Sequence, residues 1–342
     1  MNDPHSQNLF YSVLEKALGC RRKLDLLGRI GYGEFEIVVV TSVKHRICRP
    51  SSIPGFYRFV DEHELQSLED HPRVIWLLNS NLAEIGFPNL PELKKHLPQS
   101  LFVVHDFDHH HWQLGTRSAL DFSDIYISAH PYKPLLTERY NEFSHFSIGC
   151  GCLQFSEVSV VGHLKSVSVK RHSEPYGPHF FYPNFHFRNG IVQTLHQSYS
   201  SVYLKKRVSF DLPSESVQLQ EWCSHLCHWI VPVGGDLPIR FFDALCTGGI
   251  PIIPIGLKPY AISLGVPESH FVTYSCADVL SPKGTVEQAE RLFFESSVLD
   301  RAMFYLRQFQ YGLQVERFLQ DFLNRIFPTG KCGLTTDPKG NS

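Results

Sequence analysis

The sequence has no apolar run long enough to cross a membrane. A bilayer span needs about 18 consecutive apolar residues, and no segment of the 342 residues approaches that length. The first residues, MNDPHSQNLFYSVLEKALGC, also lack the basic segment followed by an apolar segment that marks a secretory signal peptide. These absences predict a cytoplasmic protein without a transmembrane segment, and they leave peripheral attachment to a membrane open.

The chain also lacks an excess of charge and an ordered pattern of cysteines. Its 32 Lys and Arg side chains nearly balance 34 Asp and Glu side chains, so binding to nucleic acid is not expected. The nine cysteines are scattered and lack the paired Cys-x-x-Cys spacing of a structural zinc site. An odd number of scattered cysteines without a signal peptide predicts reduced thiols in the cytoplasm.

The sequence does contain two series of short strands. Apolar residues make up 43% of the chain, enough for a large core. β-Branched or aromatic runs alternate with helical patterns, which is typical of parallel sheets covered on both faces. The strands are predicted over residues 35–41, 73–78, 101–104 and 124–128, and then over residues 166–170, 201–210, 228–233, 250–255 and 270–274.

We therefore predict an α/β protein with two doubly wound, Rossmann-like domains that face a cleft. The first domain covers residues 1–148 and the second covers residues 149–328, with a link in the small-residue segment FSIGCGCLQFS. Residues 297–327 have the pattern of long amphipathic helices. The Gly- and Thr-rich residues 329–342 are expected to form a flexible tail.

The most informative segment is residues 228–254, HWIVPVGGDLPIRFFDALCTGGIPIIP. An apolar strand leads into Gly234 and Gly235, a helix begins shortly afterwards, and a second strand follows. Glycines let the backbone approach a ligand, and the N–H groups at a helix start favour a phosphate. Arg240 can bind a diphosphate from the first helical turn, and Asp243 can accept both hydroxyls of a ribose. A plain βα turn with a surface Arg–Asp pair is the alternative.

This segment resembles the nucleotide-sugar-binding domain of GT-B glycosyltransferases, and in particular that of exostosin-like transferases. Those domains contain Pro-x-Gly, then Arg-x-x-(Glu/Asp)-Ala, then Gly-(Gly/Cys)-Ile-Pro, which correspond here to VPVGGDLPIRFFDALCTGGIPIIP. The resemblance implies that Asp243 takes the ribose position and Arg240 a diphosphate position, with Gly234 and Gly235 beneath the phosphates. The chain departs from the family in having Asp rather than Glu at 243, and it is not expected to carry the transmembrane anchor of eukaryotic exostosins.

Two basic residues near the start of the second domain are further candidates for donor binding. Lys170 and Arg171 follow the strand predicted over residues 166–170, and doubly wound sheets bind ligands at the carboxyl ends of their strands. In the GT-B enzymes that the chain resembles, a basic residue in this region meets the diphosphate. A solvated basic turn is the alternative.

Asp and His side chains are densest in residues 101–112, LFVVHDFDHHHW. In one interpretation, Asp106, Asp108 or His109 deprotonates the acceptor hydroxyl, a task that suits a histidine with a pKa of about 6.5. In another, Asp106 and Asp108 form the Asp-x-Asp pair with which GT-A glycosyltransferases hold Mg²⁺ or Mn²⁺ on the donor. In a third interpretation, the residues after the strand form a solvated loop without a catalytic role.

The sequence thus predicts a glycosyltransferase that moves a sugar from a nucleotide-sugar donor to a glycan acceptor in polysaccharide or glycan assembly, without an obligatory metal. The predicted donor-binding residues are Arg171, Gly234, Gly235, Arg240 and Asp243, and the predicted catalytic residues are Asp106, Asp108 and His109. Two alternatives remain open: a metal-dependent, GT-A-like transferase, and a carbohydrate- or nucleotide-binding module without turnover.

Overall fold

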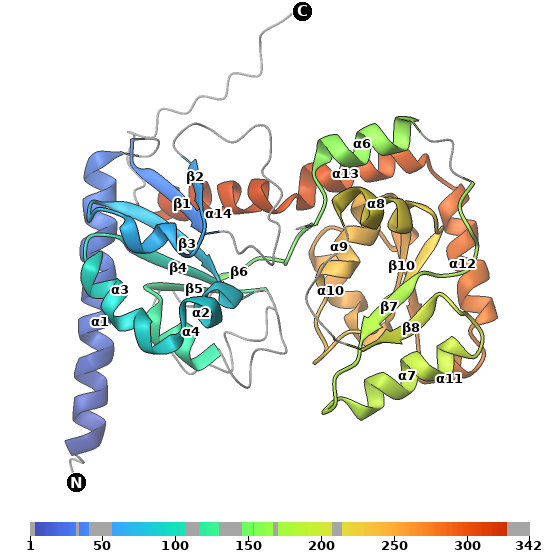
Figure 1. Ribbon diagram of the computed structural model, residues 1–342, viewed down its shortest axis with the longest axis horizontal. Helices are drawn as coiled ribbons and strands as arrows, with labels where there is room; N and C mark the ends of the chain where they lie inside the picture. The colour runs from blue at the N-terminus through green and yellow to red at the C-terminus, as the bar shows by residue number, and fades with distance from the viewer. Residues whose placement is uncertain are drawn as a thin grey trace, which may run out of the picture.

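The computed structural model contains two α/β units, one in each half of the chain (Figure 1). None of the helices in the part of the chain that it describes is long and apolar enough to span a membrane. The described residues are 4–31, 34–40, 57–106, 116–129, 146–152, 154–166, 170–206 and 214–326.

The N-terminal unit is built on a sheet of six parallel strands in the order β2-β1-β3-β4-β5-β6. Strands β3, β4 and β5 are buried along their whole length, as expected for a parallel sheet covered on both faces. The sequence predicted four of the strands and missed β2 and β6. Their bounds are β1 (Glu36–Val40), β2 (Tyr57–Val60), β3 (Arg73–Leu78), β4 (Leu101–Asp106), β5 (Ile125–Ser128) and β6 (Phe146–Ser147).

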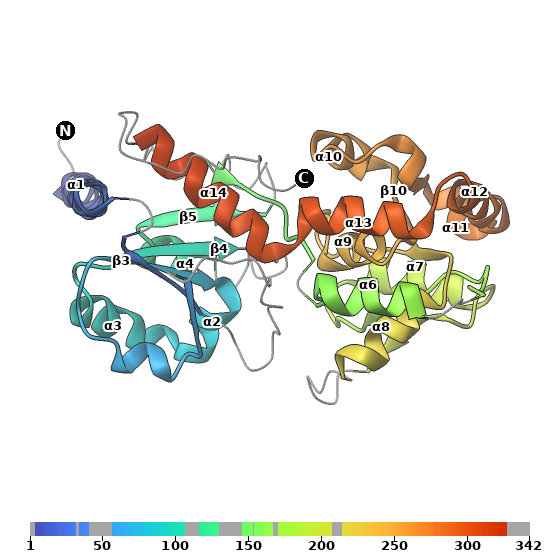
Figure 2. The same ribbon diagram turned by 90° about the horizontal axis from the view of Figure 1, so that it is seen from above.

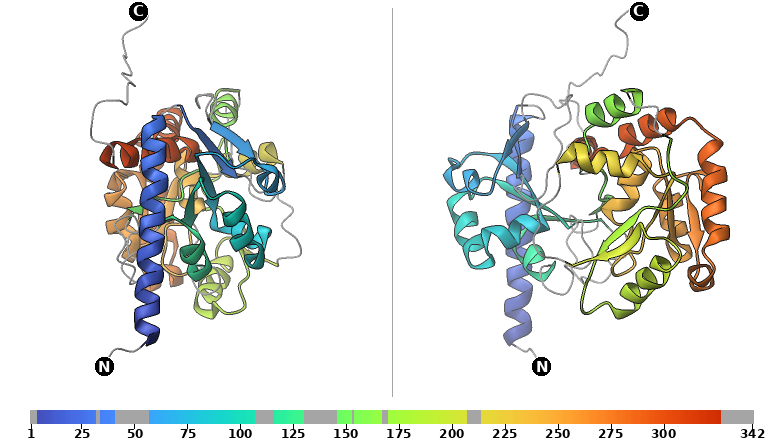
Figure 3. Two further views of the ribbon diagram at one scale, coloured as in Figure 1. Left: turned by 90° about the vertical axis from the view of Figure 1, so that its left-hand side faces the viewer. Right: turned by 45° about the vertical axis from the view of Figure 1, so that its right-hand side comes forward.

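Helices cover both faces of this sheet (Figure 2). One face packs on α1 (Pro4–Ile30) and on the last helix of the chain, α14 (Tyr311–Ile326). Helix α1 extends beyond the sheet at its N-terminal end (Figure 3). The other face packs on α2 (Asn79–Ile85), α3 (Leu90–His96), α4 (Thr116–Phe122) and η1 (Glu64–Ser67). The short turn η2 (Phe87–Asn89), which has no buried residue, connects α2 to α3.

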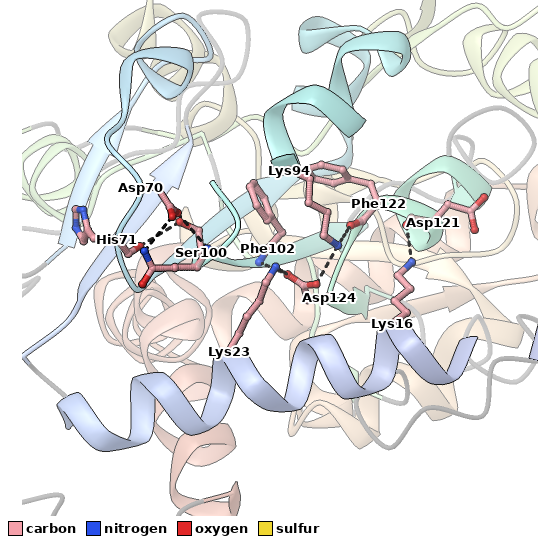
Figure 4. A network of polar contacts seen from close by, with 11 residues as sticks. Lys16, Lys23, Asp70, His71, Lys94, Ser100, Phe102, Asp121, Phe122 and Asp124 are labelled. Carbon is pink, nitrogen blue, oxygen red and sulfur yellow. Dashed lines mark hydrogen bonds and ion pairs between the residues drawn. The ribbon is translucent and has the colours of Figure 1, made fainter. Parts of the chain in front are cut away.

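A polar network fixes α1 and α3 to one strand end (Figure 4). The carboxylate of Asp124, just before β5, forms ion pairs with the Nζ of Lys23 from α1 at 2.7 Å and with the Nζ of Lys94 from α3 at 2.9 Å. It also accepts a hydrogen bond from the backbone N–H of Phe102 at 2.9 Å. Burial alone would raise the pKa of Asp124, but the two ammonium groups outweigh it and hold the pKa below its ordinary value. One buried carboxylate thus joins helices from opposite faces of the sheet.

The C-terminal unit contains a three-stranded parallel sheet, β11-β10-β9, and the parallel pair β7-β8. Tyr176 pairs with His228 in a parallel bridge, and the N–H of Trp229 donates to the carbonyl of Tyr176 at 2.9 Å. This bridge extends the order to β8-β7-β9-β10-β11. The strands are β7 (Gly177–Phe180), β8 (Val202–Lys205), β9 (Cys227–Trp229), β10 (Ile250–Pro254) and β11 (Val272–Tyr274).

Helices again cover both faces of the sheet. One side packs on α6 (Glu157–Ser166), α8 (Glu215–Cys223), α9 (Ile239–Cys246), α10 (Lys258–Ser263) and α13 (Val298–Phe309). The other packs on α7 (His186–His196), α11 (Cys276–Leu280) and α12 (Lys283–Phe294). Two short turns, η4 (Ile255–Leu257) and η5 (Glu268–His270), complete the unit.

The chain crosses between the two units twice, once in the link and once between α13 and α14, and these two segments lie side by side. Cys152 in the link pairs with Gln310 between α13 and α14. From there α14 lies on the N-terminal sheet, where the Nε1–H of Trp76 donates to the hydroxyl of Tyr311 at 2.9 Å and Phe318 packs edge-on against Trp76. By its contacts α14 is therefore part of the N-terminal unit, although the predicted boundary at residue 148 assigns it to the second domain. The predicted tail, residues 329–342, lies outside the described residues.

Candidate functional site

A cavity of about 690 Å³ opens at the carboxyl edge of the C-terminal sheet. Its wall comes from the start of α7, the loop after β9, the end of β10 and the start of α11. Open α/β sheets bind their ligands at this edge, and the volume is that of a small-molecule site. None of the residues that line the cavity is Asp or Glu.

The loop after β9 contributes two glycines to the wall of the cavity. Gly234 and Gly235 have φ angles of 76° and 79°, in the left-handed region that side chains with a Cβ rarely adopt. Both residues are exposed and line the cavity. The loop can therefore keep this path only with glycine, and it brings backbone, without side chains, to the space where a ligand would lie.

Arg188, which the sequence analysis did not select, also lines the cavity. Its side chain is nearly buried. Its Nη1 donates to the carbonyl of Phe180 at 2.8 Å and its Nε to that of Val231 at 3.2 Å, and the guanidinium lies 5.2 Å from the ring centre of Tyr182. Burial and the charge of Arg240 lower the pKa of Arg188 to about 10. Arg188 is thus a positive charge held rigidly at the strand ends.

Arg240 lies in the first turn of α9 and is half-buried. Its guanidinium has no hydrogen bond or ion pair with any residue that the structure describes. Burial lowers the pKa of Arg240, and its charge in turn helps to lower the pKa values of Arg188 and His179. Arg240 is not among the residues that line the cavity, so Arg188 is the guanidinium in the lining. A guanidinium in a lining without carboxylates favours an anionic ligand.

Asp243 does not reach the cavity. Its side chain has no exposure to solvent, and its Oδ1 accepts the thiol of Cys152, in the link between the units, at 3.4 Å. Burial raises the pKa of Asp243 to about 8. The helical spacing from Arg240 is as predicted, but α9 turns the carboxyl group into the core, so the geometry does not support the ribose contact predicted for it.

Arg171 lies at the opposite edge of the sheet. Its Nη2 donates to the carbonyl of Thr247, at the end of α9, at 2.7 Å, and its Nη1 donates to that of His225, before β9, at 3.2 Å. Arg171 was expected at the carboxyl edge because a strand was predicted over residues 166–170, and neither of the described residues in that range belongs to a strand. Ser166 is the last residue of helix α6, and Lys170 belongs to no strand and is exposed. Neither Lys170 nor Arg171 is brought to the cavity.

Asp106 is the last residue of β4 and is buried in the N-terminal unit. Its Oδ1 accepts the side-chain amide of Asn79 at 2.7 Å, and its Oδ2 accepts the hydroxyl of Tyr126 at 2.6 Å. With both oxygens engaged, Asp106 holds the ends of three strands together rather than facing an acceptor. Asp108 and His109 lie outside the described residues. No group of three His, Cys, Asp or Glu side chains among the residues described is placed to hold a metal ion.

No protein-family model and no curated protein matches the sequence. Solved structures do match it. An α-glucosyltransferase in complex with UDP-glucose and DNA aligns with a TM-score of 0.50 and 11% identity, covering 84% of this chain and 98% of that chain. A trehalose-phosphate synthase from Burkholderia vietnamiensis aligns with a TM-score of 0.49 and 7% identity, covering 85% of this chain and 98% of that chain. A sucrose-phosphate synthase from Thermosynechococcus elongatus aligns with a TM-score of 0.45 and 10% identity, covering 86% of this chain and 100% of that chain.

The fold is of the GT-B type, with two doubly wound parallel-sheet units and long C-terminal helices. The fold class predicted from the sequence is confirmed. At 11% identity the likeness establishes the fold alone, because one fold supports many activities. The exostosin-like resemblance stays a prediction.

Proposed function

We propose that the chain is a glycosyltransferase that moves a sugar from a nucleoside-diphosphate donor to a carbohydrate acceptor. The observation that carries this proposal is the cavity at the carboxyl edge of the C-terminal sheet, with its positive-φ glycine loop and the Arg188 guanidinium. A loop that exposes its backbone and a guanidinium group are both suited to binding a diphosphate. The structural neighbour with a TM-score of 0.50 is an enzyme that binds UDP-glucose, which is consistent with a donor of this class.

The roles of the residues differ in part from those predicted from the sequence. Gly234 and Gly235 would let the diphosphate approach the backbone, and Arg188 and Arg240 would balance its charge. For the base that deprotonates the acceptor, Asp108 and His109 remain the candidates, since Asp106 is committed to its neighbours. An exostosin-like subtype, a place in polysaccharide assembly and a cytoplasmic location also belong to the proposal.

In the reaction, the acceptor oxygen would form a bond to the anomeric carbon while the bond from that carbon to the diphosphate oxygen breaks. The proton of the acceptor hydroxyl would pass to the base in the N-terminal unit. Negative charge develops on the leaving diphosphate, and preorganised positive groups stabilise such charge in the transition state. Arg240 would take this part, because its guanidinium has no hydrogen bond or ion pair with any described residue. Orientation of the two substrates would supply the rest.

The test is release of nucleoside diphosphate from a panel of UDP-, GDP- and ADP-sugars, with and without EDTA. We expect release that survives EDTA and falls at least about tenfold in Arg240→Ala, as the loss of a charge-assisted contact predicts. Arg291→Ala, an exposed arginine on α12, is the matched control and should release the nucleotide at the wild-type rate.

Each other result points elsewhere. Release that EDTA abolishes would favour the metal-dependent, Asp-x-Asp transferase. Binding of a nucleotide sugar without turnover, in the presence of an acceptor panel, would favour the binding module. A wild-type chain that binds none of the nucleotide sugars by calorimetry would contradict the proposal.

A further inference from the structure

An exposed aromatic side chain lines the cavity at its mouth. Phe187, in the first turn of α7, keeps 73% of its surface exposed, although an apolar ring of this size gains free energy when it leaves water. Ile255, which follows β10, is 59% exposed and lines the same cavity. Two exposed apolar side chains at one cavity leave apolar surface there that a ligand can cover.

Phe187 is next to Arg188 in the sequence, and both residues line the cavity. Arg188 is held in place by the carbonyls of Phe180 and Val231, which also fixes the start of α7. Because both side chains line one cavity, a ligand that joins a flat ring to an anionic group can contact both of them there. A nucleoside diphosphate has these two parts, and a sugar phosphate lacks the ring.

We propose that Phe187 is the platform on which the nucleobase of the donor stacks, while Arg188 and the glycine loop take the diphosphate. This inference rests on the proposed function and deepens it, since it names the residue of the cavity that contacts the nucleobase. Every base has a π face that can stack on a phenylalanine ring. Phe187 therefore contributes affinity for nucleotides as a class and not the choice among them.

The experiment measures dissociation constants of UDP and GDP by calorimetry for the full chain. Phe187→Leu keeps an apolar side chain but removes the π face, and we expect it to weaken binding of the tighter nucleotide by about 5- to 150-fold, the range of one base–aromatic stack. Phe187→Tyr restores the ring and should restore the affinity. Phe294→Leu is the matched control, because Phe294 is 71% exposed on α12 and does not line the cavity.

The exposure of Phe187 means that these variants should fold, which a melting curve checks. Wild-type affinity in Phe187→Leu would overturn the inference and leave the proposed function standing, since the nucleotide would still bind. Equal weakening by Leu and Tyr would also overturn it, because the effect would then follow the position and not the ring. ADP is titrated against the wild-type chain as a third nucleotide, and if that chain binds none of UDP, GDP and ADP, the proposed function itself fails.

Discussion

Asp243 carries a carboxyl group with no exposure to solvent and an Oδ2 atom without a hydrogen-bond partner in the described chain. Burial raises its pKa from the ordinary 3.8 to about 8, since an apolar surrounding disfavours the charged form. Between these two values the folded protein keeps a proton that the unfolded chain releases. The contribution of the protonated carboxyl group to the free energy of unfolding is fully present below about pH 4. It is lost as pH rises to about 8, by about 1.4 kcal/mol per pH unit.

Asp243→Asn should remove this dependence on pH. The asparagine has no proton to lose, so the variant should gain stability relative to the wild type as pH rises from about 5 to about 8. Urea unfolding of both chains at several pH values measures the difference. Nucleotide affinity should stay unchanged, because Asp243 does not line the cavity. A large loss of affinity with an unchanged stability profile would instead support the ribose contact predicted from the sequence.

At the scale of helices and strands, the ion pairs of Asp124 decide how α1 is held. The pKa of Asp124 lies below its ordinary value, so the stability from its ion pairs is present above about pH 4 and is lost as pH falls through the lowered pKa. Asp124→Asn leaves the ammonium groups of Lys23 and Lys94 without their carboxylate. We expect a loss of about 3–5 kcal/mol in the free energy of unfolding near neutral pH.

The same substitution should free α1 before the sheet unfolds. Hydrogen exchange of the amides in α1 should accelerate in Asp124→Asn more than exchange in β4. The difference in stability from the wild type should shrink in acid, where Asp124 is protonated in both the folded and the unfolded wild-type chain. Equal stability of the two proteins at neutral pH would contradict the role of this network.

The elements show where sequence reasoning succeeds and where it ends. Strands such as β3 and β10 were predicted because an uninterrupted apolar run is a local signal. Strand β7 was missed, since its four residues, Gly-Pro-His-Phe, contain no β-branched residue and form no apolar run, and its pairing with β8 is set by residues further along the chain. The glycine loop was found because a positive φ demands glycine at that position itself.

The rest of the candidate site depends on contacts that no local pattern reveals. Arg188 is positioned by the carbonyl of Val231, which is 43 residues away. Asp243 is turned inward to Cys152, which is 91 residues away. Residue type and spacing predicted helix α9 and the positions of Arg240 and Asp243 on it. Packing between distant segments decided which side chains face the cavity.

At the scale of the whole molecule, α14 crosses back to the N-terminal unit and covers its sheet (Figure 1). Tyr311 stacks on His105 and its hydroxyl lies 2.9 Å from the Nδ1 of that ring. A second contact joins the units where the hydroxyl of Tyr260, on α10, donates to the carbonyl of Ala129 after β5. The link, α14 and this contact therefore fix the two units, and with them the proposed donor and acceptor sites, relative to each other.

A chain that ends at Phe309 tests the part played by α14. Tyr311, Val315 and Phe318 are buried against the N-terminal sheet, and each such side chain contributes about 1.5–3 kcal/mol. Their sum is comparable with the whole stability of a domain, about 5–15 kcal/mol. We therefore expect the shortened chain to lose cooperative unfolding in calorimetry and to aggregate in size-exclusion chromatography, because the face around Trp76 becomes exposed. A chain that ends at Ile326 removes only the residues after α14 and should melt like the full protein. If the chain that ends at Phe309 melts cooperatively at the wild-type temperature, the N-terminal sheet is stable without α14, and the helix serves only to connect the units.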